Sequence, residues 1–165
     1  MGPRVIEFNA RFGDPEAINT LPVLNTDLLD ILVAAREDDS LPKLSFSPRA
    51  TVCKYAVPDG YPTDPEAGAE VTIDEDDVNR IADEHGDGEA LLYYASVDGR
   101  DDGIYTTTSR SFAVVGAAET ITDAEEIADA AISEAGEEGL RVRHDIGKPD
   151  LVQRRIDHLA ELRGE

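Results

Sequence analysis

The chain opens with a short stretch, residues 5–9, in which apolar and polar side chains alternate. Ile6 and Phe8 fall on one face of this stretch, and Glu7 and Asn9 fall on the other. An alternation with a period of two residues predicts a half-buried strand. One face of this strand is apolar, and the other offers oxygen atoms for chemistry.

Five segments are predicted to be helices, because capping residues or a proline precede apolar side chains at helical spacing. The first is a short helix that begins at Pro15 with Asp14 as its cap, and the second lies around residues 28–35 with Asn25 or Thr26 as its cap. A third helix extends from residue 74 to Gly86. The fourth extends from Thr122 or Asp123 to Ala135, with a capping box at residues 122–125, and a terminal helix begins at Pro149. The helix around residues 28–35 is expected to pack through its apolar side. The acidic residues of the helix that ends at Ala135 are expected to cover its outer face.

Runs of β-branched and aromatic residues predict the strands, at residues 49–57, 71–73, 89–97, 104–117 and 140–143. A turn at residues 98–103 joins two of them into a hairpin. Residues 38–43 interrupt the pattern, and we place a domain boundary there. The fold class that follows is α+β, with a largely antiparallel sheet on which helices pack.

The polar face of the opening stretch has the composition of a metal and phosphate site. Glu7 and Asn9 are hard oxygen ligands two residues apart, so both side chains can point at one ion, and such oxygens suit magnesium. Arg11 continues the same alternation. A guanidinium binds phosphate or carboxylate bidentately and offsets developing negative charge, so the stretch predicts a site that handles such a group. The alternative is an ordinary strand whose polar residues face water.

Residues 7–16 read Glu-Phe-Asn-Ala-Arg-Phe-Gly-Asp-Pro-Glu. This run resembles a strand and loop of the phosphoribosylamine–glycine ligases, a family of ATP-grasp enzymes in purine biosynthesis. Two further landmarks of that family follow in the same order, at residues 60–62 (Gly-Tyr-Pro) and at residues 143–147 (Arg-His-Asp-Ile-Gly). The resemblance therefore spans about residues 4–147.

The resemblance implies a domain organisation. Residues 1–38 would be the C-terminal end of the ATP-grasp domain. Residues 39–147 would be the C-terminal domain of the ligase, mainly antiparallel β with packed helices, and residues 148–165 would be a terminal helix.

The resemblance also implies a set of site residues. Glu7 and Asn9 would hold magnesium or manganese against the phosphates of ATP, which is the cosubstrate. Arg11 would be the catalytic residue that steadies the transferred phosphoryl group. The substrate side would be formed by Arg11, Gly13, Asp14 and Glu16. Asp14 is equally well placed to cap the following helix.

In the resembled family, ATP phosphorylates the carboxylate of glycine, and the amine of phosphoribosylamine displaces the phosphate to give glycinamide ribonucleotide. The stretch before Val5 is too short to hold the N-terminal domain or the ATP-binding lobe of such an enzyme. We therefore expect a truncated or split ligase that is inactive alone, with the missing lobes on a separate chain. The alternatives are a non-enzymatic fragment that binds a partner or regulates the ligase, and an inactive gene remnant.

A fourth match to the family lies at residues 106–110, where its members usually have a threonine, small glycine-rich residues and an arginine. Arg110 matches the arginine, but Thr108 and Ser109 replace the glycines. This departure weakens the case for a close approach of the backbone to a ligand. Arg110 is therefore interpreted as a structural or peripheral residue of the site.

Acidic residues outnumber basic ones 36 to 15, and the formal net charge is -21. Such a surface repels nucleic acid and anionic membranes, so neither is an expected partner. Only Lys43, Lys54 and Lys148 are lysines. An acid-rich, lysine-poor composition is typical of halophilic organisms, in which salt near 1 M shortens the Debye length to roughly 3 Å. Periodic aliphatic runs argue against disorder.

Cys53 is the one cysteine of the chain, so an intrachain disulfide and a cysteine-based zinc cluster are excluded. We expect Cys53 to be buried on a strand, and we expect His144 and His158 to be solvated. The start of the chain lacks the apolar core of a signal peptide, and no run approaches the ~20 apolar residues of a membrane span. A cytoplasmic location is therefore expected.

Overall fold

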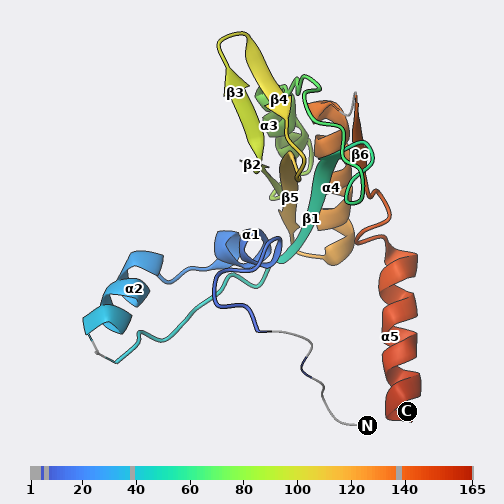
Figure 1. Ribbon diagram of the computed structural model, residues 1–165. Coiled ribbons are helices and arrows are strands. Elements are labelled where there is room, and N and C mark those ends of the chain that lie inside the picture. Colours follow the sequence, from blue (N-terminus) through green and yellow to red (C-terminus); the bar gives the residue numbers. More distant parts are fainter. Residues whose placement is uncertain (1–4, 6–7, 38–39, 137–138, 165) are drawn as a thin grey trace.

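A four-stranded antiparallel sheet with the order β2-β5-β1-β6 is the centre of the computed structural model, which describes residues 5, 8–37, 40–136 and 139–164 (Figure 1). The strands are β1 (Ala50–Pro58), β2 (Glu89–Tyr94), β3 (Val97–Arg100), β4 (Gly103–Thr106), β5 (Phe112–Ala118) and β6 (Leu140–Val142). The helices are α1 (Glu16–Thr20), a 3-10 turn η1 (Leu21–Val23), α2 (Leu28–Glu37), α3 (Glu75–Glu84), α4 (Ile121–Ala135) and α5 (Pro149–Arg163). This architecture confirms the predicted α+β class with a mainly antiparallel sheet.

The predicted hairpin of residues 89–117 forms, but it is divided into two parts. β2 pairs with β5 inside the main sheet, from Glu89 opposite Ala117 to Tyr94 opposite Phe112. β3 and β4 form a separate two-stranded ribbon beyond them. Between the two parts, residues 95–96 face the longer segment 107–111, and the extra residues interrupt the ladder.

The predicted strand at residues 71–73 is wrong. Glu70 makes only an isolated bridge to Tyr105. The amide of Val71 donates to Ile104 O at 2.7 Å. Backbone hydrogen bonds to β4 extend from Gly68 to Val71 and end there, so residues 71–73 do not form a strand.

One face of the main sheet is covered by α3 and α4, and the larger part of the core lies there. Val78 of α3, Ile132 of α4 and Val114 of β5 belong to one buried cluster. Gly116 permits the close approach of α4 to β5, because a Cβ at this position would lie 2.0 Å from Ala124 O.

Helix α4 begins at Ile121, one or two residues earlier than predicted, and its cap is different. Thr120 is the N-cap, and its hydroxyl lies 3.1 Å from the amide of Asp123 and 2.7 Å from the Asp123 carboxylate. The cap therefore lies at Thr120, and the predicted capping box at residues 122–125 is wrong. Glu125 is buried, so the prediction that the acidic residues of this helix cover its outer face is wrong for Glu125.

The opposite face of the sheet is covered by the short helix α1. Ile18 of α1 packs against a buried cluster that contains Cys53, Ala113 and Val115. Cys53 is therefore buried on a strand, as predicted. Burial, and secondarily the charge of Asp14, raise the pKa of the Cys53 thiol to about 12.

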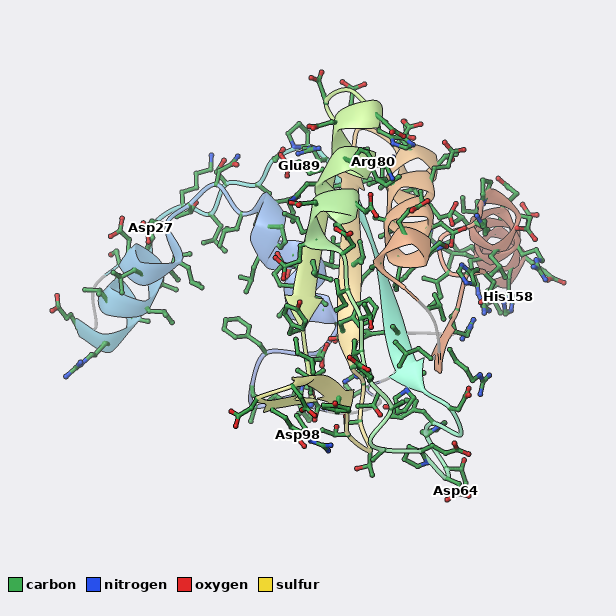
Figure 2. All side chains as sticks on the ribbon, turned by 90° about the horizontal axis from the view of Figure 1, so that it is seen from above. Asp27, Asp64, Arg80, Glu89, Asp98 and His158 are labelled. Atoms are coloured by element: carbon green, nitrogen blue, oxygen red, sulfur yellow. The ribbon has the colours of Figure 1, made fainter. Side chains whose placement is uncertain are left out.

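Helices α2 and α5 extend away from the sheet on opposite sides of the molecule (Figure 1). The side chain of Asp27 caps α2 by accepting from the amides of Leu29 and Asp30, whereas Asn25 or Thr26 was predicted. Figure 2 shows Asp27 at this outlying part of the chain and His158 on α5. His158 is exposed, as predicted.

The prediction that the helix around residues 28–35 packs is wrong within the described residues. No residue of α2 is buried, and Leu29 is 67% exposed. The terminal helix α5 forms where it was predicted, yet Ile156, Leu159 and Leu162 on it are also exposed. The described part of the chain supplies no apolar surface that covers either helix. No helix in that part is long and apolar enough to cross a membrane.

The predicted opening strand is not formed by those of its residues that the structure describes. Val5, Phe8 and Asn9 have no strand pairing, and the side chain of Phe8 is 91% exposed. Ile6 and Glu7 lie outside the described residues. A single strand needs a neighbour for its backbone hydrogen bonds and its apolar face, and the described residues place none beside Phe8.

A buried ion network joins β1, α4 and the segment that follows β6. The side chain of Lys54 is fully buried and donates to the carboxylates of Glu125 and Asp129 and to His144 O, at 2.9 Å. Lys148 Nζ lies 2.9 Å from Glu125 Oε1 and 3.0 Å from Asp129 Oδ2. His144 Nδ1 lies 2.8 Å from Asp129 Oδ1, and the His144 side chain is 43% exposed, so the expectation of a solvated His144 holds only in part.

The network sets the protonation state of Asp129. Burial raises the pKa of its carboxyl, but hydrogen bonds from Lys54, His144 and Lys148 outweigh burial and lower the pKa to about 2. A lowered pKa means that the ionised carboxylate stabilises the folded chain above its unfolded pKa of 3.8. This stabilisation is lost as the pH falls through about 2.

Replacing the buried ammonium of Lys54 should make the folded protein less stable. We expect Lys54→Met to lower the free energy of unfolding by about 3 kcal/mol, because Glu125 would stay buried with one cation fewer. Chemical denaturation measures the change. Lys43→Met is the matched control, since Lys43 is exposed. Equal effects of the two substitutions would contradict a structural role for Lys54.

Acid should remove the contribution of Asp129 over a defined pH range. We expect the free energy of unfolding of the wild type to exceed that of Asp129→Asn near neutral pH, and the difference to shrink between pH 3.8 and about 2. Denaturant titrations at a series of pH values measure this difference. A difference that stays constant down to the lower limit would contradict the role of the ionised carboxylate.

Candidate functional site

The three residues predicted to form the metal and phosphate site lie in the opening segment, ahead of the sheet. Glu7 lies outside the described residues. Asn9 and Arg11 are both exposed, and Arg11 Nη1 donates to Phe12 O of its own loop at 2.8 Å. The described residues contain no group of three or more His, Cys, Asp or Glu side chains that is arranged to hold a metal ion. The described part of the predicted site, Asn9 and Arg11, is therefore open to solvent.

Gly13 and Glu16 are brought together where the loop meets α1. A Cβ at Gly13 would lie 2.5 Å from Glu16 Oε2 and 3.2 Å from the Cβ of Glu16. Gly13 O accepts from the amide of Ala17 at 2.9 Å. The loop thus folds back on the first turn of the helix, and glycine leaves room for the carboxylate of Glu16.

Asp14 does not cap α1, contrary to one of its two predicted roles. The N-cap of α1 is Pro15, which makes no side-chain cap hydrogen bond. The carboxylate of Asp14 instead accepts from Tyr55 Oη at 2.6 Å and from Arg110 Nη2 at 2.9 Å. Arg110 Nη1 also donates to Asp14 O, at 3.2 Å. Asp14 is therefore joined to Tyr55 on β1 and to Arg110 in the segment just before β5, both far from it in the sequence.

Arg110 and Tyr55 also contact each other. The guanidinium carbon of Arg110 lies 4.9 Å from the centroid of the Tyr55 ring. Burial, and then the hydrogen bond and charge of Asp14, raise the pKa of Tyr55, so its hydroxyl remains a donor at neutral pH. These contacts fit the interpretation of Arg110 as a structural or peripheral residue. Tyr55 was missed, although the period of β1 places it on the face opposite Lys54, where its hydroxyl needs a polar partner.

The remaining two sequence landmarks lie elsewhere. Residues 60–62 form the turn after β1, in which Tyr61 N donates to Pro58 O at 3.2 Å. Gly147 has a φ of 84°, and a Cβ there would lie 2.9 Å from side-chain atoms of Glu125 and Val52. Residues 143–147 therefore pack on the α4 side of the sheet, while Asp14 lies on the other side. The structure does not gather the landmarks into one cluster.

Comparison with known proteins places this fold and its landmarks in a known group. The family model described as phosphoribosylglycinamide synthetase, C domain, matches residues 51–149. The chain is 52% identical to the phosphoribosylamine–glycine ligase of Methanosarcina acetivorans over 166 residues, which is 99% of this chain and 34% of the relative. It is 44% identical to that of Methanothermobacter thermautotrophicus, over 98% of this chain and 35% of the relative.

A solved structure supports the same fold. The crystal structure of phosphoribosylamine–glycine ligase from Thermotoga maritima matches with a TM-score of 0.69 at 24% identity, over 87% of this chain and 33% of that chain. The chain spans about a third of the length of the curated relatives that it matches. The family model covers more than half of the chain, from β1 to the start of α5. The chain therefore belongs to the phosphoribosylamine–glycine ligase family and contains its C domain.

Proposed function

We propose that this chain is the C-terminal part of an ATP-dependent ligase that joins glycine to phosphoribosylamine in purine biosynthesis and releases ADP and phosphate. The proposal rests on the 52% identity to the Methanosarcina acetivorans ligase, because that similarity extends over 99% of the chain and so takes in the opening loop. A cytoplasmic location goes with this function.

The reaction proposed for the whole enzyme has two steps. A carboxylate oxygen of glycine attacks the γ-phosphorus of ATP, the bond to ADP breaks, and glycyl phosphate forms. The amine nitrogen of phosphoribosylamine then attacks the acyl carbon and loses a proton, and inorganic phosphate departs. Both steps place negative charge on phosphoryl oxygens, so the site needs a cation with directed donors.

Arg11 is the proposed source of that cation. It is exposed, and among the described residues its guanidinium makes no ion pair with a carboxylate. A guanidinium available in this way can bind the transferred phosphoryl group or the acyl phosphate bidentately. Gly13, Asp14 and Glu16 shape the substrate side next to it.

Glu7 and Asn9 are the proposed metal ligands. The amide oxygen of Asn9 is on an exposed side chain, and together with the carboxylate of Glu7 it forms the hard-oxygen donor set that magnesium or manganese prefers. The donor chemistry therefore fits the metal. A divalent cation held there would lower the electrostatic cost of bringing the glycine carboxylate up to the phosphates of ATP.

The domain organisation of this proposal assigns residues 1–38 to the end of the ATP-grasp domain, residues 39–147 to the C-terminal domain and residues 148–165 to a terminal helix. The exposed apolar side chains of α2 support it, since Leu29 and Leu32 would be covered by the lobes that make up the rest of such an enzyme. Those lobes, on a separate chain or on the same one, are the proposed partner. Glycine, phosphoribosylamine and ATP would then bind to the complete enzyme.

A complementation assay tests the function. We expect the chain alone, in molar potassium chloride, to give no glycine-dependent ADP release with phosphoribosylamine. Adding the part of the Methanosarcina acetivorans ligase that lies outside the match should restore turnover. Glu7→Ala should lower the restored rate at least about a hundredfold, because the metal would lose its carboxylate ligand.

Glu161→Ala is the matched control, since Glu161 is an exposed carboxylate on α5 and should leave the rate unchanged. Turnover by the chain alone would show that it does not need the other lobes. A stable complex without turnover would contradict the ligase proposal and favour a fragment that regulates or binds a partner. Equal losses from Glu7→Ala and Glu161→Ala would contradict the metal role of Glu7.

A further inference from the structure

The segment of residues 13–19 is attached to the C domain at two places on the same face of the sheet. At one end, Asp14 is bound by Tyr55 and Arg110. At the other end, Thr51 Oγ1 donates to Asn19 O at 2.9 Å. Tyr55 and Thr51 have the same parity on β1, so both point away from α4. One strand therefore carries both attachments.

The attachment at Asp14 leaves neither of its carboxylate oxygens without a protein donor. Oδ1 accepts from Tyr55, Oδ2 accepts from Arg110, and the backbone oxygen accepts from the second terminal nitrogen of Arg110. The planar guanidinium is held in turn by the Tyr55 ring, 4.9 Å away. These contacts fix both the side chain and the backbone of Asp14.

The same contacts contribute more to geometry than to global stability. The side chains of Arg110 and Asp14 are 30% and 43% exposed, and partly exposed ion pairs contribute little to the free energy of unfolding. The loop that they hold, however, contains Arg11 three residues before Asp14. A phosphate-binding guanidinium must be placed to within a fraction of an ångström to act on the reacting group.

We propose that Arg110 and Tyr55 are positioning residues, which hold Asp14 and thereby place the Arg11 loop on the C domain. In this arrangement Asp14 shapes the substrate side as an anchor and makes no contact with the substrate. The effect on catalysis rests on the proposed function. The anchoring itself does not, because it can be measured on the chain alone.

Amide hydrogen exchange on the chain alone tests the anchor. The amides of Ala17 and Asn19 donate to Gly13 O and Pro15 O, so they report whether the loop stays closed on α1. We expect Arg110→Ala to speed their exchange at least about tenfold and leave the amides of β5 unchanged. Tyr55→Phe, which removes only the hydroxyl, should act in the same direction with a smaller effect.

Arg154→Ala is the matched control, because Arg154 also pairs with a carboxylate, that of Asp150, but on α5. It should leave the exchange of Ala17 and Asn19 unchanged. Exchange rates that are the same in Arg110→Ala and in the wild type would overturn the proposal, whatever the outcome of the activity assay.

Kinetics of the complemented enzyme test whether Asp14 acts through Arg110. We expect Asp14→Ala and Arg110→Ala each to lower kcat about tenfold with little change in the KM for glycine, and the double variant to be no worse than either. A raised KM in Asp14→Ala alone, or additive losses in the double variant, would overturn the anchor role in favour of substrate contact. If the wild-type complex is inactive, the proposed function fails and the exchange experiment alone decides on the anchor.

Discussion

The ammonium group of Lys54 lies in the interior of the protein, where a charge is tolerated only when each of its protons has an acceptor. Its three acceptors are the carboxylates of Glu125 and Asp129 on α4 and the backbone oxygen of His144. These groups come from separate parts of the chain, so a single side chain fixes α4 and the segment after β6 against β1. Gly147 packs closely against the side chain of Glu125, two residues before α5 begins. The same network therefore helps to place the start of α5.

The alternation of β1 divides the molecule into two parts with different tasks. Val52 and Lys54 face α4 and belong to the core and its ion network. Cys53 and Tyr55 face the opening segment, where α1 covers the apolar cluster and Asp14 is held. Asp14, which the proposal places on the substrate side, is bound on this second side. A substitution of Lys54 on the first side should therefore change stability, whereas one of Tyr55 on the second side should change the placement of the Arg11 loop.

Local patterns predicted most helices and strands because caps and periodicity act within a few residues. The start of α3 at Asp74 follows from its side chain alone, which accepts from two amides of the first turn. The sequence could not predict contacts between distant residues, such as Lys54 with Glu125, 71 positions apart. The capping box predicted at residues 122–125 does not form, because Thr120 is the N-cap and Glu125 is buried against Lys54. Residues 7–16 indicated the chemistry, but the position of that loop depends on Arg110, for which the sequence indicated only a structural role.

The buried ion network and the anchor at Asp14 use different cations for a geometrical reason. Lys54 meets three acceptors that approach from different directions, which suits a compact ammonium with three donors. Arg110 meets two acceptors of a single residue, Asp14, beside an aromatic ring, which suits a planar guanidinium that donates through two nitrogens while it stacks. In a chain with only three lysines, two converge on the buried network, as Lys148 contacts the same carboxylates. Arginine could not replace Lys54 there, because its planar fork would leave some of its five donors buried without acceptors.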